Sequence, residues 1–367
     1  MRERSVRDLN MDVAGQLHDM ALAHPSPHGR MAYKRAAQAV LRLDESLDDF
    51  AAGHELREIP FIGPASERVI REILERGTSP SVADAVAKSG RETDVQAAHA
   101  FRTNFLSRAG ALSALRAPVR GAVKREDYRG DLQMHTEWSD GAESIAGMAK
   151  AAVERGYEYI GVSDHSYGLR IARGMSMADA ARQHRQIDTL NEKTGRAFRV
   201  LKGIEANIPA EGGVDMTPEE AALFELVLAA PHSKLRRAED QTDRMLATVR
   251  HPAVHILAHP RGRMYSRQGV LARWDDVFEE ASRQGVAIEI DGDPYRQDLD
   301  HTLAARALAA GCLFALDSDA HSGAELAYAD IALAHARLAK IPPSRIVNTW
   351  PAAKLLDWSK RKRSRRR

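Results

Sequence analysis

One pattern repeats through the last two-thirds of the chain and restricts the folds open to it. Short apolar segments alternate with amphipathic helical segments, and most of the apolar segments end in a histidine, aspartate or glutamate. We expect strands near Gly130 to His135, Tyr159 to Val162, Phe198 to Gly203, Leu226 to Ala230, Val254 to Ala258, Val286 to Ile290 and Leu313 to Leu316. Apolar strands joined by helices predict a parallel α/β sheet that is covered on both faces.

About seven such strand and helix units favour closure of the sheet into a distorted (β/α)7 TIM-like barrel. The carboxyl ends of barrel strands converge at one rim, which is where barrel active sites are built. An open doubly wound sheet is the alternative. It gathers side chains from adjacent strands at a switch point, and it does not easily gather them from all seven strands.

The polar residues at the strand ends are of the types that hold zinc, manganese or iron. They are Gln133, His135 and Asp140 in DLQMHTEWSDG, His165 in GVSDHS, Glu205 in LKGIEANI, His232 in LAAPHS, His259 in HILAHP, and Asp319 with His321 in LDSDAH. A single histidine in such a place is more often a satisfied core or loop residue than a ligand. The joint occurrence of these residues on converging strand ends predicts a shared metal centre.

The chain is expected to contain a helical domain at 1–90, a helical linker at 91–128, the barrel at 129–354 and a basic tail at 355–367. The 53 basic and 51 acidic residues nearly balance, so net charge indicates no particular partner. The end KRKRSRRR is locally basic, and we expect it to be disordered and able to follow a phosphate backbone through Lys360, Arg361, Lys362 and Arg363. A tail that only aids solubility is an equal alternative.

Cys312 is the only cysteine, so a disulfide framework or a cysteine zinc ribbon is excluded. This fits a reducing cytoplasm. The sequence has no apolar run of roughly 18 residues and no hydrophobic signal core at its beginning, so we expect a cytoplasmic protein without membrane insertion. The oligomeric state does not follow from the sequence.

In its strand-end motifs the chain resembles the PHP (polymerase and histidinol phosphatase) superfamily of metal-dependent phosphoesterases, whose fold is a distorted seven-unit barrel with up to three metal ions. The resemblance covers about Arg129 to Lys354. It implies one metal at His135, Glu205 and Asp319, a second at Glu205, His232 and His259, and a third at Asp140, His165 and His321. Gln133 stands where the family usually has another histidine, and an amide oxygen is a weaker ligand that would suit manganese better than zinc.

The resemblance implies hydrolysis of phosphate esters by metal-activated water, with Glu205 and Asp319 at the centre and no serine or cysteine nucleophile. Arg173, Arg261 and Arg296 lie in loops after strand ends and are candidates for clamping phosphate oxygens, although each alone is more often a surface arginine. Asp164 and Asp317 are candidates for orienting the ligand imidazoles.

The segment LREIPFIGPASERVIREI, Leu56 to Ile73, resembles a helix-hairpin-helix element, in which a helix start presents backbone amides to a DNA phosphate. Ile62 and Gly63 would make that contact. Phe61 occupies a position that is usually glycine, which can block close approach of the backbone. A Pro-Gly turn between two helices also needs no DNA to explain it.

Together with HGRMAYKRAAQAVLRL and LQMHTEWSDG, this element resembles the bacterial family X DNA polymerases, but residues 90–131 leave no room for a polymerase palm. DNA synthesis is therefore not predicted. The leading hypothesis is a phosphoesterase with two or three divalent ions (zinc, manganese or iron) that acts on nucleic acid ends in repair, as a 3′ to 5′ exonuclease, 3′-phosphatase or abasic-site enzyme. The alternatives are a small-molecule phosphatase of the histidinol phosphate type and a non-catalytic DNA-binding scaffold.

Overall fold

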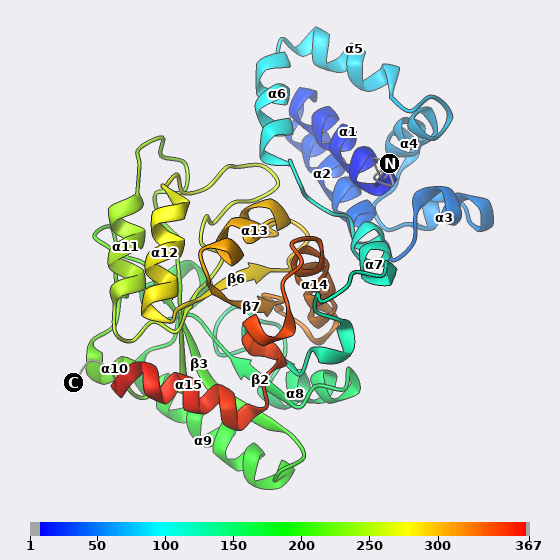
Figure 1. Ribbon diagram of the computed structural model, residues 1–367. Coiled ribbons are helices and arrows are strands. Elements are labelled where there is room, and N and C mark those ends of the chain that lie inside the picture. Colours follow the sequence, from blue (N-terminus) through cyan, green and yellow to red (C-terminus); the bar gives the residue numbers. More distant parts are fainter. Residues whose placement is uncertain (1–7, 365–367) are drawn as a thin grey trace. The chain divides into compact units, whose positions relative to one another are not determined.

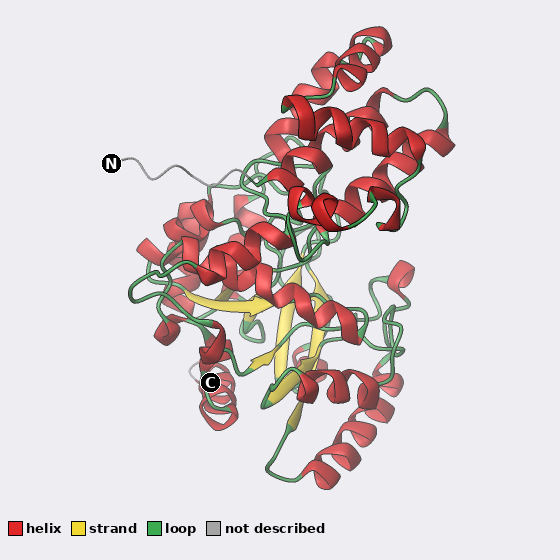
Figure 2. Cartoon of the chain, turned by 90° about the vertical axis from the view of Figure 1, so that its right-hand side faces the viewer, coloured by secondary structure: helices red, strands yellow, loops and turns green. Residues whose placement is uncertain are grey.

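The chain divides into two compact units, residues 1–117 and residues 118–367, and each is described by itself. The computed structural model describes the backbone of residues 8–364 and the side chains of residues 8–360. The first unit is helical, and the second contains all the strands of the described chain (Figures 1 and 2).

Helix α1 forms the centre of the first unit, and the other helices of the unit pack around it. The helices are α1 (Leu9–Ala23), α2 (Pro27–Leu41), α3 (Leu47–Gly53), α4 (Pro64–Arg76), α5 (Pro80–Ser89), α6 (Glu92–Phe101) and α7 (Arg108–Arg116), with a short 3-10 turn at Leu56–Glu58. Ala14 of α1 and Ala36 and Ala37 of α2 are fully buried. Such small side chains let two helices approach closely, so α1 and α2 form the main contact of this unit.

Residues 91–128 differ from the linker that we expected, because α6 and α7 belong to the helical unit. Arg102, directly after α6, is buried and lies 2.8 Å from the carboxylate of Asp19 on α1. Its guanidinium also donates to the carbonyl of Gly15 at 2.9 Å. A paired and buried cation of this kind ties α6 to α1, and the sequence pattern alone did not reveal that pairing.

The second unit is a seven-stranded, parallel, nearly closed barrel, so the predicted fold class is confirmed. The strands pair in chain order, and they are β1 (Gly130–Asp131), β2 (Tyr159–Val162), β3 (Arg199–Asn207), β4 (Leu226–Ala230), β5 (Ile256–Leu257), β6 (Ala287–Asp291) and β7 (Leu313–Asp317). Just beyond the ends of β1 and β7, Met134 and Ala320 form a parallel bridge that brings the two outer strands together.

Helices surround the strands on the outside of the barrel, and α11 and α12 lie side by side on one flank (Figure 1). They are α8 (Ile145–Glu154), α9 (Met177–Thr194), α10 (Pro218–Ala221), α11 (Thr242–Arg250), α12 (Trp274–Gln284), α13 (His301–Ala309), α14 (Ala329–Leu338) and α15 (Ala352–Ser364). Short 3-10 helices occur at Arg125–Asp127, Arg170–Ala172, Gly323–Tyr328, Pro343–Arg345 and Val347–Thr349.

Helix α15 covers the amino ends of the strands, where the predicted tail begins. Leu355 is fully buried in a cluster with Leu201 and Leu226, and the Ser359 hydroxyl donates to the carbonyl of Glu225 just before β4. The predicted basic tail at 355–367 thus begins within a helix, and the disorder expected from Lys360 onward does not hold as far as Ser364, because apolar residues in the first turns of the helix pack on the barrel core. Lys360 is exposed, and the side chains of Arg361, Lys362 and Arg363 lie outside the described residues.

Asn348 connects the two outer strands, β1 and β7, through hydrogen bonds. Its amide nitrogen donates to the carbonyls of Gly130 and Leu316 and to a carboxylate oxygen of Asp317, at 3.0, 2.9 and 2.8 Å. Its amide oxygen accepts from the backbone of Leu316 at 2.7 Å. All these groups are buried, so the network connects β1 and β7 inside the protein, away from solvent.

The substitution Asn348→Ala should lower the free energy of unfolding by about 3 kcal/mol, because it leaves several buried polar groups without partners. Urea denaturation followed by circular dichroism measures this change. Glu192→Ala, on the exposed face of α9, is the matched control and should change stability by less than about 0.5 kcal/mol. Equal stability of the two variants would contradict the assigned role of Asn348.

Candidate metal centre

The barrel brings the predicted ligand residues together at the carboxyl ends of its strands. Glu205 lies within β3 and is fully buried. The others lie in the loops that directly follow β1, β2, β4, β5 and β7, and they are Gln133, His135, Asp140, His165, His232, His259, Asp319 and His321. Residues separated by nearly two hundred positions in the chain therefore face one small volume.

The residues of the first two implied groups lie close together. The His135 Nε2 atom lies 3.2 Å from Glu205 Oε2 and 3.0 Å from Asp319 Oδ1, which makes the first group. Glu205 Oε1 lies 3.0 Å from His232 Nε2 and 3.3 Å from His259 Nε2, which makes the second.

The third group lies nearer the surface than the first two. The Asp140 Oδ1 atom is 3.6 Å from His165 Nε2 and 3.5 Å from His321 Nε2. The His135 ring stacks between the rings of His165 and His321, with ring centroids 4.4 and 4.5 Å away. His135 therefore contacts both the first and the third group. All nine predicted residues belong to one continuous cluster.

Unpartnered atoms inside the cluster fit a set of divalent cations. Buried atoms without a hydrogen-bond partner in the described chain include Gln133 Oε1, His135 Nδ1 and His165 Nδ1. Buried polar atoms are rarely left unpaired in a folded protein. Imidazole nitrogens and carboxylate oxygens are ligands that zinc, manganese and iron accept, so the residues present fit such ions.

The charge states also favour cations. Burial lowers the pKa of His165 to about 4, which leaves its imidazole neutral and able to ligate. Burial works against ionisation of Glu205, but the neighbouring His165 and His259 hold the pKa of this carboxyl well below its usual range. Burial also disfavours a charged His135, yet Asp319 and Glu205 raise its pKa well above the ordinary value. The acidic side chains thus draw positive charge into the cluster.

Gln133 contributes an amide where the family usually has an imidazole. Its nitrogen Nε2 donates to Glu205 Oε2 at 2.9 Å and lies 3.4 Å from His259 Nδ1, while its oxygen has no partner. The side chain is fully buried at the floor of the first group. An amide oxygen is a weaker ligand for such cations than an imidazole nitrogen.

Glu289 and Asp291 belong to the same region, and the sequence reasoning did not identify them. Both lie on β6 and are fully buried, with His259 Nδ1 3.4 Å from Glu289 Oε2 and 3.8 Å from Asp291 Oδ2. Burial and the neighbouring Asp291 raise the pKa of Glu289 well above its usual value. The signal was present, because Glu289 and Asp291 are carboxylates two positions apart in the apolar run AIEID, where alternate residues share one face.

The three predicted arginines have different environments. Arg296 Nε lies 3.1 Å from Asp291 Oδ2, and its Nη2 lies 3.4 Å from Asp319 Oδ2, so it borders the cluster. Arg261 is engaged with Asp298 at 2.9 Å and Asp300 at 3.0 Å. Arg173 is exposed after a 3-10 turn, with a positive φ of 55°.

We expected Asp164 and Asp317 to orient the ligand imidazoles. Their hydrogen bonds instead go to loop backbone and to neighbouring side chains. Asp164 accepts hydrogen bonds from the backbone and hydroxyl of Thr136 at 2.8 and 2.7 Å and from Gln183 of α9 at 2.7 Å. Asp317 accepts from the backbone of Leu132 at 2.8 Å. Both carboxylates therefore fix the loops that carry the ligands.

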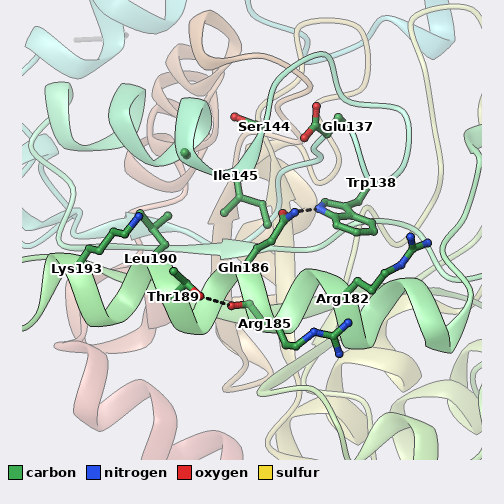
Figure 3. Close-up of a pocket in the computed structure, with 11 residues that line it drawn as sticks. Glu137, Trp138, Ser144, Ile145, Arg182, Arg185, Gln186, Thr189, Leu190 and Lys193 are labelled. Atoms are coloured by element: carbon green, nitrogen blue, oxygen red, sulfur yellow. Dashed lines mark hydrogen bonds between the residues drawn. The ribbon is translucent and has the colours of Figure 1, made fainter.

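Helix α9 also holds the loop that carries Asp140. Figure 3 shows Trp138 of this loop above α9, where its indole nitrogen donates to the Gln186 side chain at 3.1 Å and Arg182 lies 5.5 Å from the ring. These residues line a cavity of about 670 Å³. The remaining lining residues are Glu137, Ser144, Ile145, Ala146, Arg185, Thr189, Leu190 and Lys193.

A hydrogen bond to Asn207 orients the imidazole of His232. Its Nδ1 lies 2.7 Å from the amide oxygen of Asn207, at the end of β3. Asn207 in turn donates to Asp215 at 2.6 Å and to the Ser166 hydroxyl at 3.0 Å. This chain of hydrogen bonds leaves Nε2 facing Glu205, as a ligand nitrogen requires.

In the helical unit, the hairpin before α4 keeps its shape without the usual glycine. Phe61 has a left-handed backbone, with φ 66°, and its side chain is 65% exposed. Gly63 is the N-cap of α4, and its amide donates to the Ser66 hydroxyl at 2.9 Å. Ile62 is buried, so it anchors the turn from inside.

The helix-hairpin-helix prediction is confirmed by the "Helix-hairpin-helix domain" family, whose model matches residues 8–79. No helix in the described part of the chain is long and apolar enough to cross a membrane.

Known proteins match larger parts of the chain. The chain is 35% identical over 202 residues to "DNA polymerase/3'-5' exonuclease PolX" of Bacillus subtilis, a match that covers 54% of this chain and 35% of that protein. It is 30% identical over 240 residues to "Probable phosphatase YcdX" of Escherichia fergusonii, covering 62% of this chain and 93% of that protein. The chain thus spans about a third of PolX and nearly all of YcdX.

A solved structure of histidinol phosphate phosphatase from Lactococcus lactis, complexed with zinc, L-histidinol and phosphate, matches with a TM-score of 0.39 and 13% identity. The match covers 65% of this chain and 93% of that chain. A likeness at this level adds nothing to the functional argument.

Removing divalent ions with a chelator should lower the thermal unfolding midpoint of the protein, and manganese or zinc should restore it. An ion present at a hundred times its dissociation constant stabilises a folded chain by about 2.7 kcal/mol. Glu205→Gln should also reduce the number of bound ions per chain, measured by elemental analysis, because Glu205 borders the first two groups. Glu192→Gln is the control, and equal metal content in both variants would refute the assignment.

Proposed function

Because the chain belongs to the PHP family of metal-dependent phosphoesterases, we propose that it hydrolyses phosphate esters at the ends of nucleic acid strands. The activity would be that of a 3′ to 5′ exonuclease, a 3′-phosphatase or an abasic-site enzyme. The observation that carries this proposal is the presence, in one chain, of the nine-residue cluster and a helix-hairpin-helix domain.

The first, second and third groups would each hold one divalent cation, with Glu205 available to the first two. Such ions, when bound, activate water and neutralise charge on a phosphate. The chain supplies the positioning. Asp164 holds the loop of His135, Asn207 orients His232, and Arg296 offers a guanidinium beside Asp319 that can attract a phosphate oxygen.

No protein nucleophile is needed for this reaction. Cys312 is buried, and burial raises the pKa of its thiol to about 12, so it stays protonated at neutral pH. Serines close to the cluster, such as Ser139, Ser163, Ser166 and Ser318, are buried and hydrogen-bonded to protein groups. Attack by water is the chemistry that this environment supports.

A small-molecule phosphatase is the second candidate, and one finding favours it. The match to YcdX covers 93% of that protein with only 62% of this chain, so a relative named as a probable phosphatase is matched almost in full by part of this chain. Under this interpretation the helix-hairpin-helix domain would have no part in catalysis. The third interpretation, a non-catalytic scaffold, gives no reason for the complete set of ligand-competent side chains.

The direct experiment uses DNA with a labelled 3′ end, with manganese added to the full-length protein. Release of nucleotide or phosphate is expected, and His135→Ala should lower the rate by at least about a hundredfold, since a ligand of the centre is lost. Cleavage of a small phosphate ester without any action on DNA would decide for the second candidate.

The contribution of the hairpin can be tested with Gly63→Asp. Aspartate is a favourable N-cap, and a Cβ atom at this position would meet no atom within 4 Å, so the helix should be retained. Its carboxylate would repel a phosphate at the helix start, and the ratio of DNA cleavage to small-ester cleavage should fall about tenfold.

Ser26→Asp places the same charge at the N-cap of α2 in the same unit and should leave that ratio near its original value. An equal fall in both variants would show a general charge effect, and no fall in either would exclude the hairpin from DNA binding.

A further inference from the structure

A basic pocket opens directly beside the second metal group. It has a volume of about 510 Å³ and is lined by His232, Lys234, Leu235, Arg236, Arg237 and Arg267. His232 also lies 3.0 Å from Glu205, so this residue forms part of both the cluster and the pocket. A ligand that fills the pocket would therefore adjoin a group held at the metal centre.

The positive charge in this pocket is largely uncompensated. Arg236 and Arg237 are exposed and form no ion pair among the described residues. Lys234 has a distant acidic neighbour, Glu239, at 3.8 Å. Burial and the cations of Arg296 and Arg236 together lower the pKa of Arg267, which shows that like charges crowd this region. An anion would relieve that repulsion.

The two loops that form the pocket are held in place by hydrogen bonds to their backbone carbonyls and by close packing. Buried Arg244 donates to the carbonyls of Ile208 and Ser233 at 2.6 and 3.1 Å, and Gln241 donates to the carbonyl of Lys234 at 3.0 Å. Gly262, with φ 54°, lies so close to Leu235 that an added Cβ atom would meet the leucine side chain at 2.6 Å. The cationic side chains therefore extend from a fixed base.

We propose that this pocket binds the phosphodiester groups next to the phosphate at the metal centre, and thereby selects oligonucleotides over small phosphate monoesters. The inference rests on the proposed function and names the substrate class of the same site. The lining contains several cations, one aliphatic residue and no aromatic residue other than His232. Such a lining recognises a sugar-phosphate backbone without reading its bases, so binding should be independent of sequence.

The experiment measures how oligothymidylates of one, two and four nucleotides inhibit hydrolysis of p-nitrophenyl phosphate by the metal-loaded, full-length protein. An oligonucleotide competes whether or not it is cleaved, so binding is measured apart from cleavage. In the original protein the inhibition constant should fall with each added phosphate. In the double variant Arg236→Gln/Arg237→Gln, the tetranucleotide should bind about tenfold more weakly, because two charge-assisted contacts are lost.

Salt dependence provides a second measure. For single strands, each lost phosphate contact should reduce the slope of log affinity against log salt by about 0.7. Arg196→Gln/Lys340→Gln also removes two exposed charges, and it should keep the original length dependence. Arg196 precedes β3 and Lys340 follows α14, both at the opposite end of the barrel from the cluster. Thermal unfolding of each variant verifies that it is folded.

The inference is overturned if the tetranucleotide inhibits the original protein no better than the mononucleotide does. It is also overturned if the Arg236→Gln/Arg237→Gln variant keeps the original length and salt dependence. Failure of the proposed function looks different, because oligonucleotides would then compete in a length-dependent manner and remain uncleaved. If the Arg236→Gln/Arg237→Gln variant cleaved DNA and bound the tetranucleotide as tightly as the original protein does, the proposed role of the pocket would be rejected and the proposed function would stand.

Discussion

Glu205 is the residue on which the arrangement of the barrel depends. An ionised carboxylate in a protein interior is strongly destabilising unless charges or hydrogen bonds compensate it. Here four imidazoles lie within 3.0 to 3.7 Å of its oxygens. Asp319 adds further negative charge close by. The barrel therefore concentrates acidic groups at one point, where bound cations would balance their charge, and hydrogen bonds from Asp164, Asp317 and Asn207 fix the loops around it.

The strands and the residues at their ends could be predicted from the sequence because both follow simple rules. Apolar runs such as LVLAA predict buried strands, and the carboxyl ends of parallel strands must meet at one rim. Glu289 was missed because it lies inside the run AIEID, whereas the pattern of strand-end residues covers only the ends. Asp291 ends β6 and fits that pattern, but the expected strand Val286 to Ile290 stopped one residue before it. The role of Asp164 was misjudged for another reason, since a carboxylate next to a ligand can bind loop backbone as readily as imidazole, and only coordinates distinguish the two.

The ends of the two units were predicted less well because they depend on tertiary contacts. Nothing in the pattern of residues 91–117 shows that Arg102 pairs with Asp19, more than eighty positions earlier. In the same way, the basic composition of the last residues suggested a free tail. The few apolar residues among them, such as Leu355, are enough to bury a helix against the barrel. The composition of a segment therefore does not determine whether it folds, because that also depends on the part of the protein against which it packs.

The position of α15 has a consequence for how the charged end of the chain can act. The helix lies over the amino ends of the strands, and the metal cluster lies beyond their carboxyl ends. Lys360 therefore lies at the opposite end of the barrel from the metal cluster. A nucleic acid strand that contacted Lys360 would have to follow the outside of the barrel before its end reached Glu205. Under the proposed function, only a long strand would contact both places, and a short fragment held at the cluster would not reach Lys360.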